Sequence, residues 1–216
     1  MTRGRAVGRG RFIVVEGPDG AGKSTLARWL ARRLRAAGQQ VVAVREPGGT
    51  PVAEAARKVV LRFPHAMTPA AELFLMLVAR ADLVDRVIRP ALASGRVVVA
   101  DRFDLSTLAY QVAGGGMAGG AVRVGNRLAT GGLRPDLTLV LDVPVAVGRV
   151  RQRRSGKKRD RFERRGDAYH ARVLRAYRNA RGPGVVHIDA SQPRRAVQAA
   201  AWQHVTRVGL NPRGMS

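Results

Sequence analysis

Cysteine, aromatic residues and acidic residues are scarce in this chain. None of its 216 residues is a cysteine, which excludes disulfides, thiolate catalysis and cysteine-based metal sites. Aromatic residues make up 5% of the chain, but hydrophobic residues as a whole make up 45%, enough for a globular core. No apolar run reaches membrane-spanning length, and no apolar segment before Phe12 indicates a signal peptide. We therefore expect a globular protein of a reducing compartment, with a cytoplasmic location and no membrane partner.

The shortage of acidic residues leaves a large positive charge. The chain has 39 Lys and Arg against 15 Asp and Glu, a formal net charge of +24. Residues 149–181 alone hold 14 basic and three acidic residues. This charge is compatible with a well-solvated, arginine-rich surface and also with polyanionic ligands, either nucleotides or nucleic acid. We expect residues 1–11, which hold four arginines among glycines, to form a disordered basic arm.

A glycine-rich segment near the N-terminus matches the phosphate-loop pattern G-x-x-x-x-G-K-[ST]. It reads Gly17-Pro18-Asp19-Gly20-Ala21-Gly22-Lys23-Ser24-Thr25. A β-branched run at 12–15 predicts a buried strand before it, and the leucine spacing at 26–34 predicts a helix after it. Backbone N–H groups of such a loop and the helix N-terminus attract phosphate, while Lys23 adds a positive charge and Ser24 offers a hydroxyl to Mg²⁺. The segment therefore predicts an ATP site.

Short apolar runs alternate with helical patterns along the rest of the chain. Strands are predicted at 12–15, 41–44, 97–100, 137–141 and 185–188. Helices are predicted at 52–62, 70–89, from 105 onward, at 121–129, from 160 to about 181, and at 193–208, with a flexible glycine loop at 114–120. This alternation predicts an α/β, P-loop NTPase-like fold of three layers, in which helices cover both faces of a five-stranded parallel sheet. We expect one domain over 12–208 and a tail at 209–216.

Two further residues draw attention by their position. Asp101 ends the third strand, which is where a Walker-B aspartate holds Mg²⁺ beside a phosphate loop; we expect it to act through water. Arg80 lies in an otherwise apolar stripe of the 70–89 helix, four residues after Met76. A buried arginine needs a partner, although a snorkelling position at the rim would also satisfy it.

Taken together, these segments resemble thymidylate kinases of the bacterial type. The matching stretches are 12–25, 45–50, 101–111, 134–143 and 160–163, with Arg80 and its helix. The most family-specific are the Arg-Glu-Pro-Gly-Gly-Thr loop at 45–50 and the Asp-Arg-x-x-x-Ser-Thr-x-Ala-Tyr-Gln stretch at 101–111. The resemblance implies transfer of the ATP γ-phosphoryl group to dTMP with Mg²⁺, and a homodimer built on the long helices.

The resemblance also implies roles for individual residues. Arg102 would grip the acceptor phosphate, and Arg80 would hydrogen-bond a thymine carbonyl. Thr107 and Gln111 would line the base pocket. Tyr110 would stack on the sugar where a 2′-hydroxyl would clash, which favours deoxyribose.

The resemblance implies further roles for two residues near the acceptor site and for a lid segment. Asp19 would lie near the sugar and the metal, and Glu46 lies in the acceptor-side loop. The arginine-dense segment at about 149–166 would be a mobile lid over ATP. Some members of the family carry an arginine in the phosphate loop, and others carry it in the lid. Ala21 stands at that loop position here, so the sequence resembles the members with a lid arginine. The lid candidates are Arg149, Arg153, Arg154, Lys157 and Arg161. We assign catalysis to Lys23, Asp101, Arg102 and a lid arginine, with Arg153 and Arg161 the leading choices.

One position departs from the family pattern. Met76 stands where a phenylalanine usually stacks on the base, and a thioether gives less flat contact. A related kinase of a different or modified deoxynucleoside monophosphate is therefore an alternative function. A nucleic-acid-stimulated P-loop ATPase is a second alternative, based on the net charge alone. We do not expect specific nucleic-acid binding.

Overall fold

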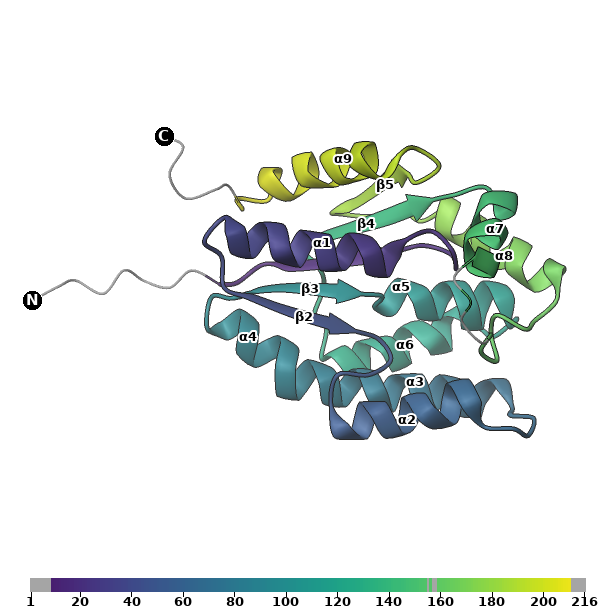
Figure 1. Cartoon of the computed structure of the whole chain (residues 1–216). Coiled ribbons are helices and arrows are strands. Elements are labelled where there is room, and N and C mark those ends of the chain that lie inside the picture. Colours follow the sequence, from purple (N-terminus) through teal and green to yellow (C-terminus); the bar gives the residue numbers. More distant parts are fainter. Residues whose placement is uncertain (1–8, 155, 157–158, 211–216) are drawn as a thin grey trace, which may run out of the picture.

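A computed structural model describes residues 9–154, 156 and 159–210 of the chain (Figure 1). Its centre is a five-stranded sheet in the order β2-β3-β1-β4-β5, in which every recorded pairing is parallel. The strands are β1 (Phe12–Glu16), β2 (Val41–Arg45), β3 (Val97–Asp101), β4 (Leu137–Asp142) and β5 (Val185–Asp189). This confirms the predicted fold class and all five predicted strands.

The central strand β1 is buried along its whole length, and its side chains alternate between two cores. Ile13 and Val15 join the core on one face, while Phe12 and Val14 join the core on the other. Continuous apolar runs such as 97–100 are expected for strands that are covered on both faces. In the register, Val15 lies opposite both Asp101 of β3 and Leu139 of β4, so the carboxyl ends of the three strands meet at one edge.

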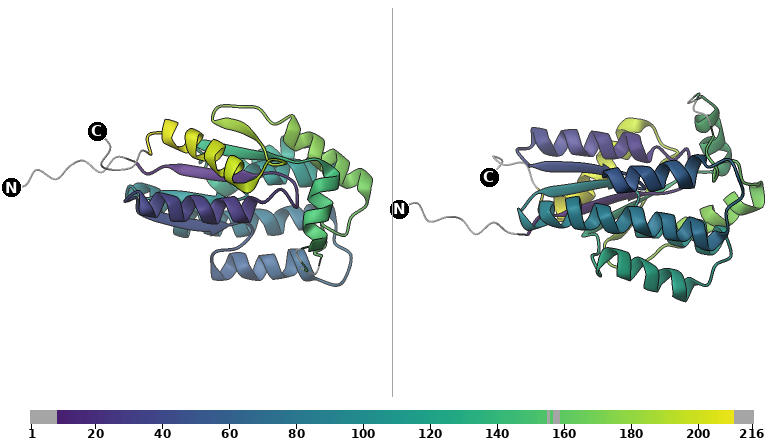
Figure 2. Two further views of the ribbon diagram at one scale, coloured as in Figure 1. Left: turned by 45° about the horizontal axis from the view of Figure 1, so that its top comes forward. Right: turned by 90° about the horizontal axis from the view of Figure 1, so that it is seen from below.

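Two helices cover the first face of the sheet. They are α1 (Lys23–Ala36) and α9 (Arg194–Arg207), and both bury apolar residues in the same core (Figures 1 and 2). Leu26, Leu30 and Leu34 form the buried stripe of α1, as their spacing predicts.

The helices on the other side are α2 (Pro51–Arg62), α3 (Pro69–Leu83), α4 (Arg89–Ala93), α5 (Asp104–Thr107), α6 (Gly119–Thr130) and α8 (Asp167–Arg178). Two π-helical segments, η1 (Val84–Ile88) and η2 (Leu108–Gly114), extend α3 and α5. The predicted helix at 70–89 therefore continues through η1 into α4 and ends at Ala93. The π-helical segment ends two residues before Pro90, which lacks the N–H that a regular helix would use there.

The structure corrects two other sequence predictions. A helix does not start at Asp160, because residues 159–166 make only irregular structure and a turn before α8 begins at Asp167. Asp160 and Glu163 bond reciprocally to each other's backbone N–H at 2.9 and 3.0 Å, but extended backbone at Gly166 interrupts the helical path. The glycine loop is also shorter than predicted, because Gly119 and Gly120 open α6.

The remaining helix, α7 (Val145–Arg154), follows β4 and lies at the carboxyl edge of the sheet, where α5 also begins (Figure 1). The chain enters and leaves at the opposite edge, where the Gly10 N–H donates to Leu92 O at 2.9 Å. Residues 1–8 of the predicted arm, and 211–216 of the tail, lie outside the described residues. Within the described residues, no helix is long and apolar enough to cross a membrane.

Candidate active site

The phosphate loop connects β1 to α1 at the carboxyl edge of the sheet. Gly20 and Gly22 both have positive φ angles, 79° and 94°, which side chains rarely adopt. A Cβ atom on Gly20 would also lie 2.2 Å from the Gly148 carbonyl oxygen, so α7 packs directly on the loop. Ala21 is buried, and the Thr25 N–H donates to Gly22 O at 3.1 Å to start the helix. The loop is therefore a curled backbone cradle of the kind that binds phosphate.

Lys23 is held inside this loop. Its Nζ atom donates to Pro18 O at 2.7 Å and lies 3.8 Å from Asp19 Oδ1, and only 7% of the residue is exposed. Burial, with the nearby positive charge of Arg102, lowers the pKa of Lys23 to about 8. An anion bound in the loop would restore the charged form, so the site is built to receive negative charge.

Ser24 and Asp101, the two residues that the sequence predicts to hold Mg²⁺, lie in direct contact. The Ser24 hydroxyl donates to Asp101 Oδ2 at 2.5 Å, because β1 and β3 are neighbours and both end at this edge. Mg²⁺ prefers oxygen ligands and keeps several waters, so one hydroxyl, one carboxylate and the phosphates of ATP form a suitable set. The described residues contain no cluster of three or more His, Asp or Glu side chains that would bind a metal alone.

Arg102 is the centre of a polar network beside the loop. It directly follows β3 and has a φ angle of 77°, a left-handed conformation that is costly for arginine. Its guanidinium forms an ion pair with Asp19 and donates to Tyr110 Oη at 3.0 Å, Gly17 O at 3.2 Å and Ser106 Oγ at 3.1 Å. Tyr110 in turn donates to the second Asp19 oxygen at 2.7 Å. Three of the predicted site residues, Asp19, Arg102 and Tyr110, are thus in direct contact.

Sequence reasoning missed the group that supports Arg102 from behind. Glu16, fully buried, accepts from the backbone N–H groups of Phe103 and Ser106 at 2.8 and 3.0 Å. Its other oxygen accepts from the hydroxyls of Ser106 and Tyr177 at 2.7 and 3.0 Å, and Tyr177 Oη accepts from Arg102 at 3.0 Å. Burial raises the pKa of Glu16, while Arg102 opposes that effect. The available signal was an acid at the end of an otherwise apolar strand.

Arg80 and Glu46 form a buried pair deeper in the site. Arg80 is 3% exposed, which excludes the rim position. Its Nε atom donates to Glu46 Oε2 at 2.8 Å, and its Nη2 atom lies 2.7 Å from the same oxygen. The guanidinium also donates to Thr107 Oγ1 at 2.7 Å, Asn126 Oδ1 at 2.5 Å and Phe103 O at 2.9 Å. Burial raises the pKa of Glu46 to about 7, against the lowering effect of Arg80. Nothing in the sequence pattern of α6 pointed to Asn126.

The other predicted base-pocket residues are buried or half-buried, and Thr107 contacts Arg80 directly. Thr107 and Gln111 are 2% and 3% exposed. Both amide atoms of Gln111 are buried and have no hydrogen-bond partner among the described residues. Met76 is half-buried and packs with Tyr110 in one apolar cluster. A buried amide without partners is costly, so Gln111 is suited to bind a polar ligand.

The arginines at 149–166 differ in their exposure and in their partners. Arg153 and Arg154 are exposed at the end of α7, and Arg149 forms an ion pair with Asp167. Arg161 instead points to the loop between α2 and α3, where it donates to Phe63 O and His65 O at 2.7 and 2.6 Å. Lys157 lies outside the described residues.

A second ion pair, not predicted, fixes the end of this segment. Arg165 donates to both carboxylate oxygens of Glu72 at 2.6 and 2.7 Å and lies over the rings of Phe162 and Tyr169. Glu72 is 2% exposed, so the pair is largely shielded from water. The stretch after residue 160 is therefore anchored to α3, unlike the end of α7.

Comparisons with known proteins agree with this geometry. The family model described as thymidylate kinase matches residues 15–201. A thymidylate kinase of Pseudomonas entomophila (strain L48) is 48% identical over 195 residues, covering 88% of this chain and 92% of that protein. One from Cereibacter sphaeroides (strain ATCC 17029 / ATH 2.4.9) is 49% identical over 201 residues, covering 89% and 93%. The phosphate loop and the 101–111 stretch both fall inside the matched region, and the chain belongs to the thymidylate kinase family.

Proposed function

We infer that the protein transfers the γ-phosphoryl group of ATP to dTMP, giving dTDP and ADP. Family membership supports this activity directly. The structural observation that carries it is one continuous network at the carboxyl edge of the sheet: Lys23 contacts Asp19, Asp19 pairs with Arg102, and Arg102 contacts Tyr110. The loop that we propose to bind ATP and the arginine that we propose to bind the acceptor thus lie side by side, which supports a phosphoryl transfer between two nucleotides.

The reaction needs positioning and charge neutralisation more than acid–base catalysis. The second pKa of a phosphate monoester is about 6, so the acceptor is mostly a dianion at neutral pH and needs no strong general base. Lys23 stabilises negative charge on the β- and γ-phosphates. Mg²⁺, held by Ser24 and through water by Asp101, would neutralise the charge shared by those phosphates.

Arg102 binds the acceptor phosphate in this proposal. Its guanidinium is paired with Asp19 and surrounded by the hydroxyls of Tyr110, Ser106 and Tyr177. A phosphate dianion offers more charge and more acceptor atoms than one carboxylate, so it can take over some of these hydrogen bonds. Asp19 then becomes free to face the sugar or the metal.

The base enters beside Gln111 and Thr107. Gln111 offers an amide donor and acceptor without other partners among the described residues, which complements the N3–H and carbonyl groups of thymine. Arg80 already makes four hydrogen bonds, so its contact with a thymine carbonyl would replace one of them. Tyr110 is held against Asp19 and would face the sugar, where it favours deoxyribose.

We propose that residues of about 149–166 close as a lid and that Arg153 supplies the lid charge. Arg161 is already held by two backbone carbonyls, and its neighbour Arg165 by Glu72, which makes that half of the segment a fixed base. Arg153 is exposed on α7, which packs on the phosphate loop at Gly20. Lid closure would exclude water and limit hydrolysis of ATP.

A homodimer is the proposed assembly. Large apolar side chains are exposed on neighbouring helices: Phe74 (64%) and Val78 (48%) on α3, Val52 (45%) on α2 and Leu128 (85%) on α6. Phe74 and Val78 are one helical turn apart and share a face. Large apolar side chains exposed on neighbouring helices are typical of a protein interface, in line with the implied dimer on the long helices. Because ATP and nucleotide monophosphates are cytosolic substrates, we also propose a cytoplasmic location.

A coupled assay of ADP formation with dTMP, dUMP, dGMP and dCMP tests the function. We expect turnover with dTMP and its loss in Lys23→Ala, with the circular dichroism spectrum unchanged. Turnover of another monophosphate but not dTMP would favour the alternative that Met76 raises. Hydrolysis that DNA or RNA stimulates while dTMP has no effect would favour the nucleic-acid ATPase. The family match favours neither alternative.

A further inference from the structure

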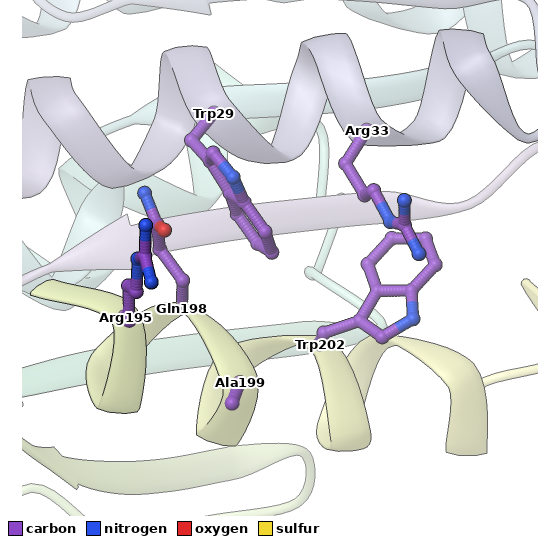
Figure 3. Close-up of a pocket in the computed structure, with 6 residues that line it drawn as sticks. All are labelled: Trp29, Arg33, Arg195, Gln198, Ala199 and Trp202. Carbon is purple, nitrogen blue, oxygen red and sulfur yellow. The ribbon is translucent and has the colours of Figure 1, made fainter.

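A groove lies on the face of the molecule that α1 and α9 cover, and the function proposed above does not use it. It has a volume of about 300 Å³ and is lined by Trp29, Arg33, Arg195, Gln198, Ala199 and Trp202. These two tryptophans are the only ones in the chain. Figure 3 shows both indoles projecting into the space between the helices, with Arg33 beside Trp202 and with Arg195 and Gln198 on the side of Trp29.

Each indole keeps part of its ring surface exposed, although the Arg33 guanidinium lies over the Trp202 ring. Their centroids are 6.3 Å apart with an angle of 84° between the planes, so they meet edge to face and nothing fits between them. Both are only half-buried, and among the described residues neither indole N–H has a hydrogen-bond acceptor. The Arg33 guanidinium lies 5.3 Å from the Trp202 ring centroid, which leaves its N–H groups at the groove. A flat ring that carries a negative charge would find both stacking and ionic partners here.

The charged residues of α1 and α9, the two helices that form the groove, are all basic. Neither α1 nor α9 contains an acidic residue, whereas α1 carries four arginines besides Lys23 and α9 carries three. In the described part of the chain, Arg28, Arg32, Arg33 and Arg195 have no carboxylate within ion-pair distance. A second copy of this chain would bring the same charge to this face, so like-charge repulsion disfavours self-association here.

We propose that this groove binds single-stranded nucleic acid without sequence preference, by stacking a base on an indole and pairing the backbone with the arginines. Aromatic platforms within a basic surface are how sequence-independent single-strand sites are built. Both helices have 14 residues, about 21 Å at 1.5 Å per residue, and arginines are spread along them. A free nucleotide carries its phosphates at one end and reaches few of these charges, whereas a strand reaches several.

The two tryptophans provide a local probe, because the chain has no others. The ligand is a 12-residue deoxycytidine oligonucleotide, added to the full-length protein with ADP and dTMP saturating the nucleotide sites. We expect the oligonucleotide to quench tryptophan fluorescence and dCMP at equal nucleotide concentration not to do so. Equal quenching by dCMP would identify a mononucleotide site and overturn the proposal, and no quenching by either would overturn it as well.

Two variants separate stacking from charge, with binding followed by fluorescence anisotropy of a labelled oligonucleotide. Trp202→Leu keeps the net charge and should weaken binding roughly 5- to 150-fold without changing its salt dependence. Arg195→Gln should lower the slope of log affinity against log salt by about 0.7. Arg127→Gln, an equal charge change at an exposed position of α6 on the far side of the sheet, is the matched control.

Kinase activity should stay unchanged in all three variants, since none of these residues belongs to the nucleotide sites. If Arg195→Gln and Arg127→Gln weaken binding equally, the protein binds only through its overall charge and the groove proposal is wrong. The oligonucleotide-binding results do not depend on the proposed kinase reaction, which the Lys23→Ala assay tests separately.

Discussion

The buried pair of Arg80 and Glu46 provides the sharpest test of the site as described. The perturbation is Arg80→Met, which keeps an extended apolar side chain of similar length but removes the guanidinium. Glu46 then loses its cation, and its second oxygen already lacks a partner among the described residues. Asn126 Oδ1 and Phe103 O each lose a donor in the same step.

The expected cost follows from these contacts. Removing one member of a buried ion pair costs about 3–5 kcal/mol of unfolding free energy, because the other charge is left without compensation. Glu46→Gln should cost less, about 1–3 kcal/mol, because the Gln carbonyl can still accept from Arg80, which retains three other acceptors. In the double variant no charge is stranded, so its cost should fall short of the sum by about 2 kcal/mol or more.

The pH dependence gives a second readout of the same pair. Burial raises the pKa of Glu46 from an ordinary 4.5 to about 7, so the folded state holds a proton that the unfolded state releases. The stability from this group is therefore full below pH 4.5 and is lost as the pH rises through 7. Without Arg80 the carboxylate has no opposing cation, so Arg80→Met should be destabilised more at pH 8 than at pH 5.

Urea denaturation followed by circular dichroism measures all four proteins at both pH values. The wild type, the two single variants and the double variant form one thermodynamic cycle. Additivity within 0.5 kcal/mol, or a pH-independent loss in Arg80→Met, would refute the idea that these two groups stabilise each other. A loss of dTMP affinity in the stable double variant would further place the pair in the base pocket.

Four other predictions concern the nucleotide sites and the assembly. Met76→Phe should lower the KM for dTMP roughly 2- to 10-fold at similar kcat, because a flat ring adds stacking on the base. Steady-state kinetics measures both constants, and an unchanged or higher KM would contradict the placement of Met76 beside the base. The pKa of Lys23 is about 8, so the side chain is mostly neutral at pH 9, and ATP binding at that pH should make it take up a proton. Calorimetry in buffers of different ionisation enthalpy measures this uptake, and ATP binding without it would contradict a neutral, buried lysine. Arg153→Ala should lower kcat about 10³-fold, whereas Arg161→Ala should mainly lower the thermal midpoint; the reverse pattern would assign the lid charge to Arg161. Phe74→Glu should halve the mass measured by light scattering, and a wild type that is already monomeric removes the proposed interface.

Much of the fold and part of the site could be predicted from the sequence, because the signals are local. Four-residue β-branched runs predict buried strands, and Gly17 to Thr25 predict a phosphate loop through backbone freedom and one charge. Asp101 is predicted to hold Mg²⁺ with Ser24 because it ends a strand beside the phosphate loop; the structure places the two side chains in hydrogen-bond contact, while the metal site itself stays a prediction. Arg80 was expected to need a partner because it interrupts an apolar stripe, and Glu46 is that partner.

The other contacts depend on residues that are far apart in the chain and so leave no local pattern. Glu16 supports Arg102 through Tyr177, which is 161 residues away from Glu16. Asn126 holds Arg80 across 46 residues, although an asparagine within a helix carries no signal of its own.

The lid shows the same division. The density of arginines at 149–166 is plain in the sequence, but only the structure separates an anchored Arg161 from an exposed Arg153. The sequence by itself determined where the strands and helices alternate along the chain, where the phosphate loop lies, and the net charge. Only the tertiary structure decided which charges are paired, because ion pairing depends on distances that packing of the sheet and its helices sets.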